Sequence, residues 1–175
     1  MRAEAESADR PIYISGLAPD SKNRILEWQQ SYSMGISLFD EQHKELIRLI
    51  NDLYAASQKG WSYTRVALMR LMRYVLDYFQ MNMIKEERIM ERIGYPGYRE
   101  HKREHVAFLK EVLVEVTYLQ TNQMIDIKSF ILFLRDWILS HVGICDKKLG
   151  LYLVRLKKEG NLNAFMQVDI EVSGN

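Results

Sequence analysis

The sequence predicts an all-α protein, an antiparallel up-down-up-down four-helix bundle with an irregular N-terminal arm and a short C-terminal tail. Apolar residues recur at steps of three and four residues in four long segments, which is the period of an amphipathic helix. The three prolines stand at positions 11, 19 and 96, outside those segments, so none of them interrupts a predicted helix. The connections between the segments are short, and short connections make consecutive helices antiparallel.

Composition and charge are those of an ordinary globular protein. A chain of 175 residues suits one domain with a sizeable core, and 47% of its residues are hydrophobic. The net charge of +1 gives no reason to expect a nucleic-acid partner. The single cysteine, Cys145, excludes an internal disulfide and indicates a reducing compartment. Since no secretory signal and no membrane-spanning run is found, we expect a cytoplasmic monomer without membrane contact. No protein partner is indicated.

The first two helices occupy the first half of the chain. Residues 40–58 carry an apolar stripe that also contains His43. Residues 57–64 are expected to form a loop, with Thr64 as the N-cap of the next helix. That helix is expected over 64–92, where stripe positions follow one another in bundle-type steps of 4, 3, 4, 3, 4 and 3 residues: Leu68, Met72, Val75, Phe79, Asn82, Glu86 and Ile89.

The second half of the chain carries two further helices. The sequence GYPG at 94–97 breaks the second helix, and residues 121–126 form another break. The third helix is expected over 98–120 and the fourth over 127–157. We therefore divide the chain into an arm, a bundle and a tail, residues 1–30, 31–158 and 159–175. The tail contains VDIEV, which is either a short strand or a loose segment.

Polar residues interrupt the apolar stripes at a few positions. All four histidines of the chain fall on the stripes of the first, third and fourth helices, and the second helix contributes Glu86. Burying such groups without partners costs several kcal/mol, and a shared metal centre removes that cost. Residues four apart project from one helix face, which applies to the pair His101 and His105 and to the pair Asn82 and Glu86. Imidazole with carboxylate and no thiolate suits iron, manganese or zinc. The alternative is a set of unrelated core hydrogen bonds.

Asp146 is harder to place from its spacing alone. It follows His141 by five residues, so the two side chains are about 140° apart on an ideal helix at about 100° per residue. A local distortion near Gly143, or a reach from the edge of the face, would be needed to bring Asp146 to the apolar side. Without one, it is a surface aspartate. The neighbouring Cys145 is interpreted as a small core residue.

Three motifs follow one another at the predicted helical places. They are Trp28 followed by GISLFDEQHKEL (35–46), EERIMERIGYPGYREHKREHVAF (86–108) and WILSHVGICD (137–146). They are similar to the patterns Trp…G-I…D-x-Q-H-K-x-L, E-E-x-x-M…G-Y-P…H-x-x-x-H…F and W-L-x-x-H-(x4)-D. With these motifs the chain resembles the bacterial hemerythrins, the non-heme di-iron oxygen-binding bundles, over about residues 28–153.

The resemblance implies a set of ligands and a cofactor. In that family five histidines, a glutamate and an aspartate hold two irons, and dioxygen is the ligand. Carried over by resemblance, one iron would be held by His101, His105 and His141, and the other by His43. Glu86 and Asp146 would bridge the two irons. Trp137 and Ile138 would line the oxygen pocket, and the neighbouring apolar residues Phe79, Met81 and Met83 would exclude water.

One family ligand is missing from this chain. The family motif H-F-x-x-E-E reads N-M-I-K-E-E here, so Asn82 stands at the position of the remaining histidine. In the family this residue belongs to the oxygen-binding iron, which already has an open position. If two metals still bind, Asn82 coordinates weakly through its carbonyl oxygen or leaves a water in its place. The chain would then serve oxygen carriage, storage or sensing.

Two alternatives stay open. In the first, a single metal remains at His101, His105 and His141, and the chain is an oxidative or peroxide-handling enzyme. In the second, the bundle is degenerate and acts as an interaction or signalling module. We see neither a glycine-rich phosphate loop nor a G-x-S-x-G motif, which speaks against nucleophilic catalysis. The resemblance favours an oxygen- and metal-binding protein over an enzyme.

Overall fold

The computed structural model describes residues 17, 19–121 and 123–161, and all regular elements in this part of the chain are helices. A short 3₁₀-helix, η1 (Gln30–Tyr32), precedes the bundle. The four rods of the bundle are α2 (Ser37–Ser57); α3 (Trp61–Tyr78) with the π-helical η2 (Phe79–Met83) and α4 (Ile84–Arg92); α5 (Tyr98–Gln120); and α6 (Ile127–Trp137) with the π-helical η3 (Ile138–Asp146) and α7 (Lys147–Lys158).

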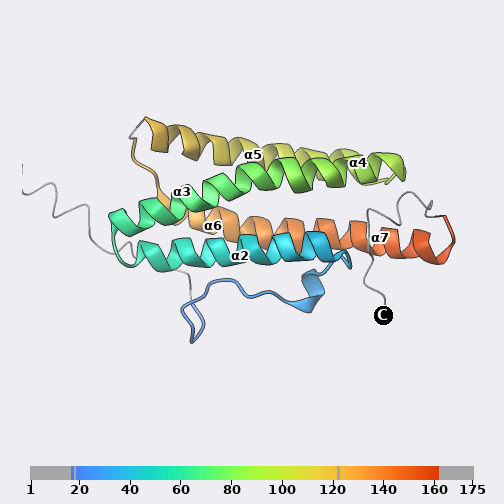
Figure 1. Cartoon of the computed structure of the whole chain (residues 1–175), viewed down its shortest axis with the longest axis horizontal. Helices are drawn as coiled ribbons and strands as arrows, with labels where there is room; N and C mark the ends of the chain where they lie inside the picture. The colour runs from blue at the N-terminus through green and yellow to red at the C-terminus, as the bar shows by residue number, and fades with distance from the viewer. Residues whose placement is uncertain (1–16, 18, 122, 162–175) are drawn as a thin grey trace, which may run out of the picture.

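The four rods lie roughly side by side, and consecutive rods run in opposite directions (Figure 1). This arrangement confirms the predicted helical bundle. Two of the connections allow consecutive rods to reverse direction. The loop between α2 and α3 is short, and Gly94, with a φ of 62°, adopts the left-handed conformation that follows the end of α4. Within the described residues no helix has both the length and the apolarity that crossing a membrane would take. The segment VDIEV of the tail lies outside the described residues.

The second rod begins earlier than its sequence indicates. It starts at Trp61, so the prediction that Thr64 caps this helix is wrong. Thr64 is fully buried in the first turn, and its hydroxyl donates a hydrogen bond to the carbonyl of Gly60 at 2.8 Å. A hydroxyl that donates to the carbonyl four residues back belongs to a residue inside a helix, whereas an N-cap side chain accepts from a backbone N–H. The other predicted breaks, at 94–97 and 121–126, are confirmed.

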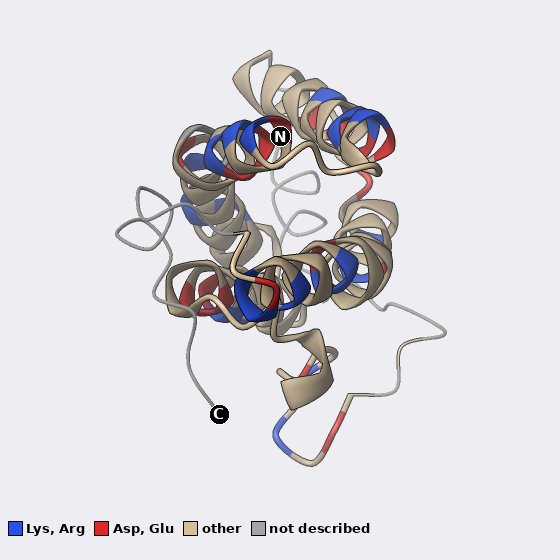
Figure 2. Ribbon diagram, turned by 90° about the vertical axis from the view of Figure 1, so that its right-hand side faces the viewer, with Lys and Arg blue, Asp and Glu red and all other residues tan. Residues whose placement is uncertain are grey.

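The core is divided along the bundle axis into two apolar clusters. The smaller cluster lies at the end of the bundle where α4 and α7 meet the segment before α2, and it contains Phe39, Ile89 and Leu149. The larger cluster fills the rest of the bundle and contains Leu46, Met83 and Phe108 among many others. On each rod, buried polar residues stand between the two clusters. The positions of charged residues are spread along the ribbons of the rods (Figure 2).

The segment before α2 packs on the outside of the bundle, along α2 (Figure 1). Asn51 of α2 holds it through both ends of its amide. Its Oδ1 accepts from the backbone N–H groups of Ile25 and Leu26 at 2.9 and 3.1 Å, and its Nδ2 donates to the carbonyl of Leu26 at 2.8 Å. Lys147 of α7 adds a hydrogen bond of 2.7 Å to the carbonyl of Ser33. The described part of the predicted arm is therefore attached to the bundle.

Candidate metal centre

A polar layer separates the two apolar clusters of the core. Its members come from all four rods, and each is at most 3% exposed: His43, Asn82, Glu86, His101, His105, His141 and Asp146. Six of the candidate ligands approach one another in this layer, and Asn82 is buried on the same rod as Glu86. Burial of this many ionisable groups in one layer is costly unless the groups satisfy one another or share a bound ion.

Three histidines and two carboxylates converge on one point. One donor atom from each of Glu86, His101, His105, His141 and Asp146 lies within 4.8 Å of all the others. Nε2 of His101 is 3.1 Å from Nε2 of His105 and 3.1 Å from Oδ1 of Asp146. Ligand atoms at about 2.1 Å from a common metal are about 3.0–3.4 Å apart at adjacent vertices. These distances therefore match the edges of a coordination polyhedron, here called the first position.

A fourth histidine approaches the other oxygen of Asp146. Oδ2 of Asp146 is turned away from the first position and lies 3.2 Å from Nε2 of His43. Glu86 approaches His105 with Oε2, at 3.4 Å, while its Oε1 is buried and has no hydrogen-bond partner among the described residues. Asn82 precedes Glu86 by one turn on the same rod, so its amide lies on the same face. The approach of His43 to Oδ2 of Asp146 is here called the second position, and Glu86 and Asn82 are buried residues of the second rod.

Unpartnered polar atoms gather in this layer. Among the described residues, most of the buried side-chain nitrogen and oxygen atoms without a hydrogen bond belong to His43, Asn82, Glu86, His141 and Asp146. The close approaches of His43 and His141 to Asp146 are not aligned for hydrogen bonds, because the atoms on both sides remain without one. Buried polar groups are normally paired. Donor atoms that point at a common centre instead of at one another are those of a metal site, and the residues fit a bound metal.

The histidines of the first position are oriented by carboxylates behind them. Nδ1 of His141 lies 2.7 Å from Oε2 of Glu104, and Nδ1 of His105 lies 3.2 Å from Oε1 of Glu87. Lys102 pairs with the other oxygen of Glu87 at 2.8 Å. A carboxylate on Nδ1 selects the tautomer in which Nε2 is free to ligate and makes that nitrogen more basic. Glu87 and Glu104 both stand within the motif at 86–108, but the spacing assigns neither of them a role because neither lies on an apolar stripe.

The buried charges balance one another. Burial would raise the pKa of Asp146, but His141, His101 and His43 outweigh it and hold that pKa well below its usual value. Burial would lower the pKa of His101, but the adjacent carboxylates of Asp146 and Glu86 raise it to about 10. Burial and the charge of Asp146 would raise the pKa of Glu86, but His101 and His105 hold it below its usual value. Both carboxylates are therefore ionised at neutral pH, which is the form that binds a cation. Burial also raises the pKa of Tyr78, whose ring lies 6.2 Å from that of His43.

Asp146 reaches the centre through a change of helix type. The segment η3 (Ile138–Asp146) is π-helical, and hydrogen bonds from residue i to i+5 bring residues five apart onto one face. The predicted distortion near Gly143 is confirmed, and the alternative of a surface aspartate is wrong because Asp146 is fully buried. Asn82 also lies in a π-helical turn, η2. Both π-helical segments of the described rods, η2 and η3, therefore contain a residue of the polar layer. A change of helix type there alters the direction in which that side chain points.

Aromatic and aliphatic side chains close the layer on one side. The ring of Trp137 stacks on His141 at 4.6 Å and on Phe108 at 4.0 Å, and Ile138 is fully buried. Met83 is also buried, as expected. The expectation for Met81 is wrong, since this side chain is 65% exposed and points away from the core. The side chain of Phe79 lies outside the described part of the structure.

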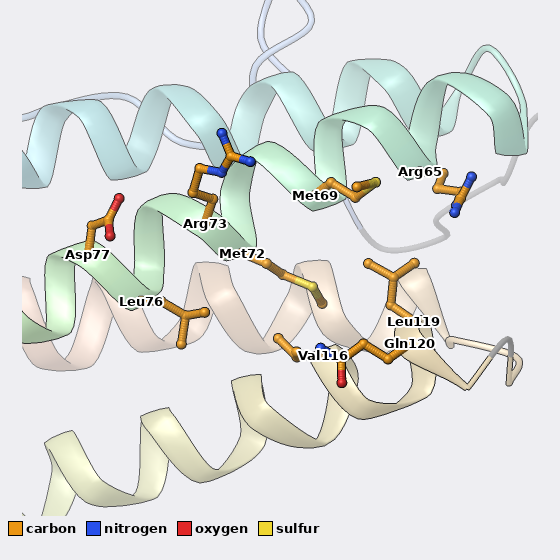
Figure 3. Close-up of a pocket in the computed structure, with 9 residues that line it drawn as sticks. All are labelled: Arg65, Met69, Met72, Arg73, Leu76, Asp77, Val116, Leu119 and Gln120. Atoms are coloured by element: carbon orange, nitrogen blue, oxygen red, sulfur yellow. The ribbon is translucent and has the colours of Figure 1, made fainter.

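A separate groove lies between α3 and α5. It has a volume of about 600 Å³, and its walls include Met69, Met72 and Leu76 of α3 and Val116 and Leu119 of α5 (Figure 3). Arg65, Arg73 and Asp77 stand along the α3 side of the groove (Figure 3). None of the seven residues of the polar layer lines it. The groove is therefore distinct from the candidate metal centre.

This fold and this layer define a cation-binding helical bundle. The model of the hemerythrin HHE cation binding domain matches residues 34–150. The chain belongs to the hemerythrin family, which implies iron binding, and the histidine–carboxylate cluster is able to hold a metal. The family resemblance drawn from the three motifs is thereby confirmed.

Individual relatives agree with this assignment. The bacteriohemerythrin of Stenotrophomonas maltophilia (strain R551-3) is 31% identical over 118 residues, which are 67% of this chain and 74% of the relative. A hemerythrin-like protein of Naegleria gruberi is 26% identical over 121 residues, 69% of this chain and 87% of the relative. A crystal structure of wild-type hemerythrin covers 71% of this chain and 95% of its own, with a TM-score of 0.61 at 24% identity. At this level of identity, the likeness to the crystal structure shows a shared fold.

Proposed function

We propose that the chain holds two non-heme irons and interacts with dioxygen, for oxygen carriage, storage or sensing. One observation carries this proposal. Asp146 offers Oδ1 to His101 and His141 and Oδ2 to His43, and Glu86 has one oxygen near His105 and one without a partner. A carboxylate that presents its two oxygens to two different sets of ligands is a bridge. A single-metal site has no use for His43 or for the second oxygens.

The roles of the residues follow from this geometry. His101, His105 and His141 hold the iron of the first position, and His43 holds the iron of the second. Glu86 and Asp146 bridge the two and neutralise part of their charge. Asn82 completes the second position through its carbonyl oxygen or leaves room for a water. Bound iron supplies the reversible exchange of electrons with dioxygen.

The apolar side chains beside the polar layer support binding of a small apolar molecule. Trp137 and Ile138 line the oxygen pocket, and Met83 contributes a further buried apolar side chain. Nε1 of Trp137 is buried without a hydrogen-bond partner among the described residues, so this apolar wall contains one free donor. Exclusion of water by such a wall lowers the local dielectric and strengthens the electrostatic interactions inside the site.

The single-metal enzyme is the second candidate, and one observation favours it. The second position has one imidazole, whereas the first has three, so only the first is assured of strong nitrogen ligation. In that case iron would be retained by His101, His105 and His141 alone. The interaction module, the third hypothesis, predicts a protein whose stability does not respond to iron.

Metal content and spectrum test the proposal together. The full chain is freed of metal, reconstituted anaerobically with iron(II), passed through a desalting column and analysed for iron. Oxygen is then admitted and removed while the absorption spectrum is recorded. Two irons per chain with a charge-transfer band that appears with oxygen and reverses on its removal support the proposal. A single retained iron without the band points to the enzyme, and absence of iron with unchanged thermal stability points to the interaction module.

A further inference from the structure

We propose that a clamp outside the polar layer positions His43 against Asp146 at the second position. The clamp consists of Ser33, Asp40 and Lys147, and none of these three residues is a candidate metal ligand. Asp40 is the positioning residue at its centre. The inference rests on the proposed function, because its test compares the iron held at two positions. It concerns how this chain keeps the second position assembled.

Asp40 attaches the start of α2 to the segment that precedes it. Its Oδ2 accepts a hydrogen bond from the hydroxyl of Ser33 at 2.5 Å, and its Oδ1 accepts one from the backbone N–H of Met34 at 2.9 Å. Asp40 is only 8% exposed, and His43 follows it by three residues, so both side chains lie on the inner face of α2. The turn at Ser33–Met34 is thereby fixed to α2 less than one helical turn from His43.

The same turn is attached to the fourth rod at two points. Nζ of Lys147 donates a hydrogen bond to the carbonyl of Ser33 at 2.7 Å. Three residues further along α7, Gly150 lies so close to the turn that an added Cβ would be 2.7 Å from Cα of Met34. Lys147 directly follows Asp146, the last residue of η3. The turn therefore connects α2 near His43 with the fourth rod next to Asp146.

Hydrogen bonds through this turn add direction to the apolar packing between α2 and the fourth rod. The backbone of α2 makes few close approaches to η3 and α7, whereas η1 lies directly against η3. Phe39 of α2 and Leu149 of α7 belong to the smaller apolar cluster. Apolar packing is non-directional, whereas hydrogen bonds prefer a defined distance and angle. The clamp therefore sets the position of the start of α2 relative to the end of η3.

His43 depends on the position of its helix more than His141 does. Nε2 of His43 lies 3.2 Å from Oδ2 of Asp146, but the two groups are not aligned for a hydrogen bond. Nδ1 of His43 is also buried and has no hydrogen-bond partner among the described residues, whereas Nδ1 of His141 lies 2.7 Å from Oε2 of Glu104. Because metal ligands must be held within about 0.5 Å of the productive geometry, the clamp supplies for His43 the precision that Glu104 supplies for His141.

Anaerobic binding of iron(II) to the full chain tests the clamp. Metal-free wild type and variants are dialysed to equilibrium against a series of free iron(II) concentrations, and iron per chain is measured at each. Asp40→Ala removes both hydrogen bonds to the turn, so one of the two irons should bind about 10-fold more weakly or be lost, while the other is retained. Lys147→Met keeps the apolar stem and removes the donor, so it should act in the same direction from α7.

Two variants separate positioning from loss of charge. Asp40→Asn keeps an acceptor for the N–H of Met34 and offers a donor to the hydroxyl of Ser33, so it should restore most of the affinity that Asp40→Ala loses. Lys148→Met is the control for Lys147→Met, because it removes the same charge from the next residue, which is exposed. If Asp40→Asn binds as weakly as Asp40→Ala, charge and not positioning explains the effect, and the inference is overturned.

A further control separates positioning from general loss of stability. Asn51→Ala detaches the same segment from α2, since it removes the hydrogen bonds to Ile25 and Leu26, but it does so eight residues beyond His43. It should keep both irons. Circular dichroism and thermal unfolding confirm that each variant is folded, and Lys147→Met carries the test if Asp40→Ala does not fold.

The outcomes separate this inference from the proposed function. Weakening of one iron in Asp40→Ala and Lys147→Met, with both irons retained in Asn51→Ala and Lys148→Met, supports the inference. Two tightly held irons in folded Asp40→Ala and Lys147→Met overturn it and leave the two-iron function standing. An equal loss of iron in Asn51→Ala also overturns it. A single iron per chain in wild type overturns the two-metal function and this inference with it.

Discussion

Nε2 of His141 lies 3.3 Å from Oδ1 of Asp146, although Asp146 follows five residues later in the same rod. The π-helical segment η3 brings the two side chains to one face, and α7 then continues as an ordinary helix. With Oδ1 held near His141, Oδ2 is directed at His43 of α2. The change of helix type is thus what lets one aspartate face two sets of ligands. π-helical turns are rare in proteins and frequently occur at functional sites.

Substitutions of single histidines should separate the two positions. His43→Ala removes the only imidazole of the second position, so we expect loss of one metal per chain and retention of the other. His141→Ala removes one of three imidazoles and should weaken the first position. Anaerobic iron titration followed by metal analysis measures both effects. Loss of all metal from His43→Ala would show that the positions do not bind independently.

Glu104 should affect metal affinity without touching the metal. Glu104→Gln keeps an acceptor for the Nδ1–H of His141 but removes the charge that makes Nε2 more basic. We expect iron to bind about 10–100-fold more weakly at the first position. Glu100→Gln is the matched control, because Glu100 lies on the same helix, is largely exposed and pairs with Arg103 at 3.6 Å. The measurement is an anaerobic iron titration, and equal affinities for the two variants would contradict the role assigned to Glu104.

Metal should reverse the pH dependence of stability. The pKa of His101 rises from 6.5 to about 10 in the metal-free fold, so its contribution to the free energy of unfolding is full below pH 6.5 and is lost as pH rises toward 10. Metal binding requires deprotonated imidazole and releases protons, so stabilisation by metal grows over the same range. Thermal unfolding of metal-free and metal-loaded protein at several pH values checks this. Parallel slopes for the two forms would refute it.

Close packing of α7 on the segment before α2 should make Gly150 intolerant of substitution. A Cβ on Gly150 would lie 2.7 Å from Cα of Met34 and would also meet the Met34 carbonyl. Gly150→Ala should therefore lower the free energy of unfolding by about 1–3 kcal/mol, as overpacking does. Gly143→Ala is the control, since its Cβ would lie at an ordinary 3.6 Å from the ring of Tyr32. Urea unfolding of both variants measures the difference, and equal losses of stability would contradict the steric explanation.

The number, order and approximate limits of the helices could be predicted from local spacing. Apolar periodicity depends only on neighbours within a few turns, and the breaks at 94–97 and 121–126 follow from local chemistry. The start of α3 was misplaced by three residues because Ser and Thr hydroxyls bond to backbone groups both at caps and inside helices. The same local reasoning could identify His43, Glu86, His101, His105 and His141 as a set, since each stands on an apolar stripe.

The sequence by itself determined which residue types lie on the inner faces of the rods, and therefore the chemistry of the polar layer, including the amide at position 82. Tertiary structure alone decided three further properties. It set the helix face on which Asp146 lies, and it directed one oxygen of Asp146 to His141 and the other to His43. It also paired His141 with Glu104. The physical reason is distance along the chain. Spacing within one helix sets a face, whereas contacts between different rods depend on how those faces pack and on where a helix changes its hydrogen-bonding pattern.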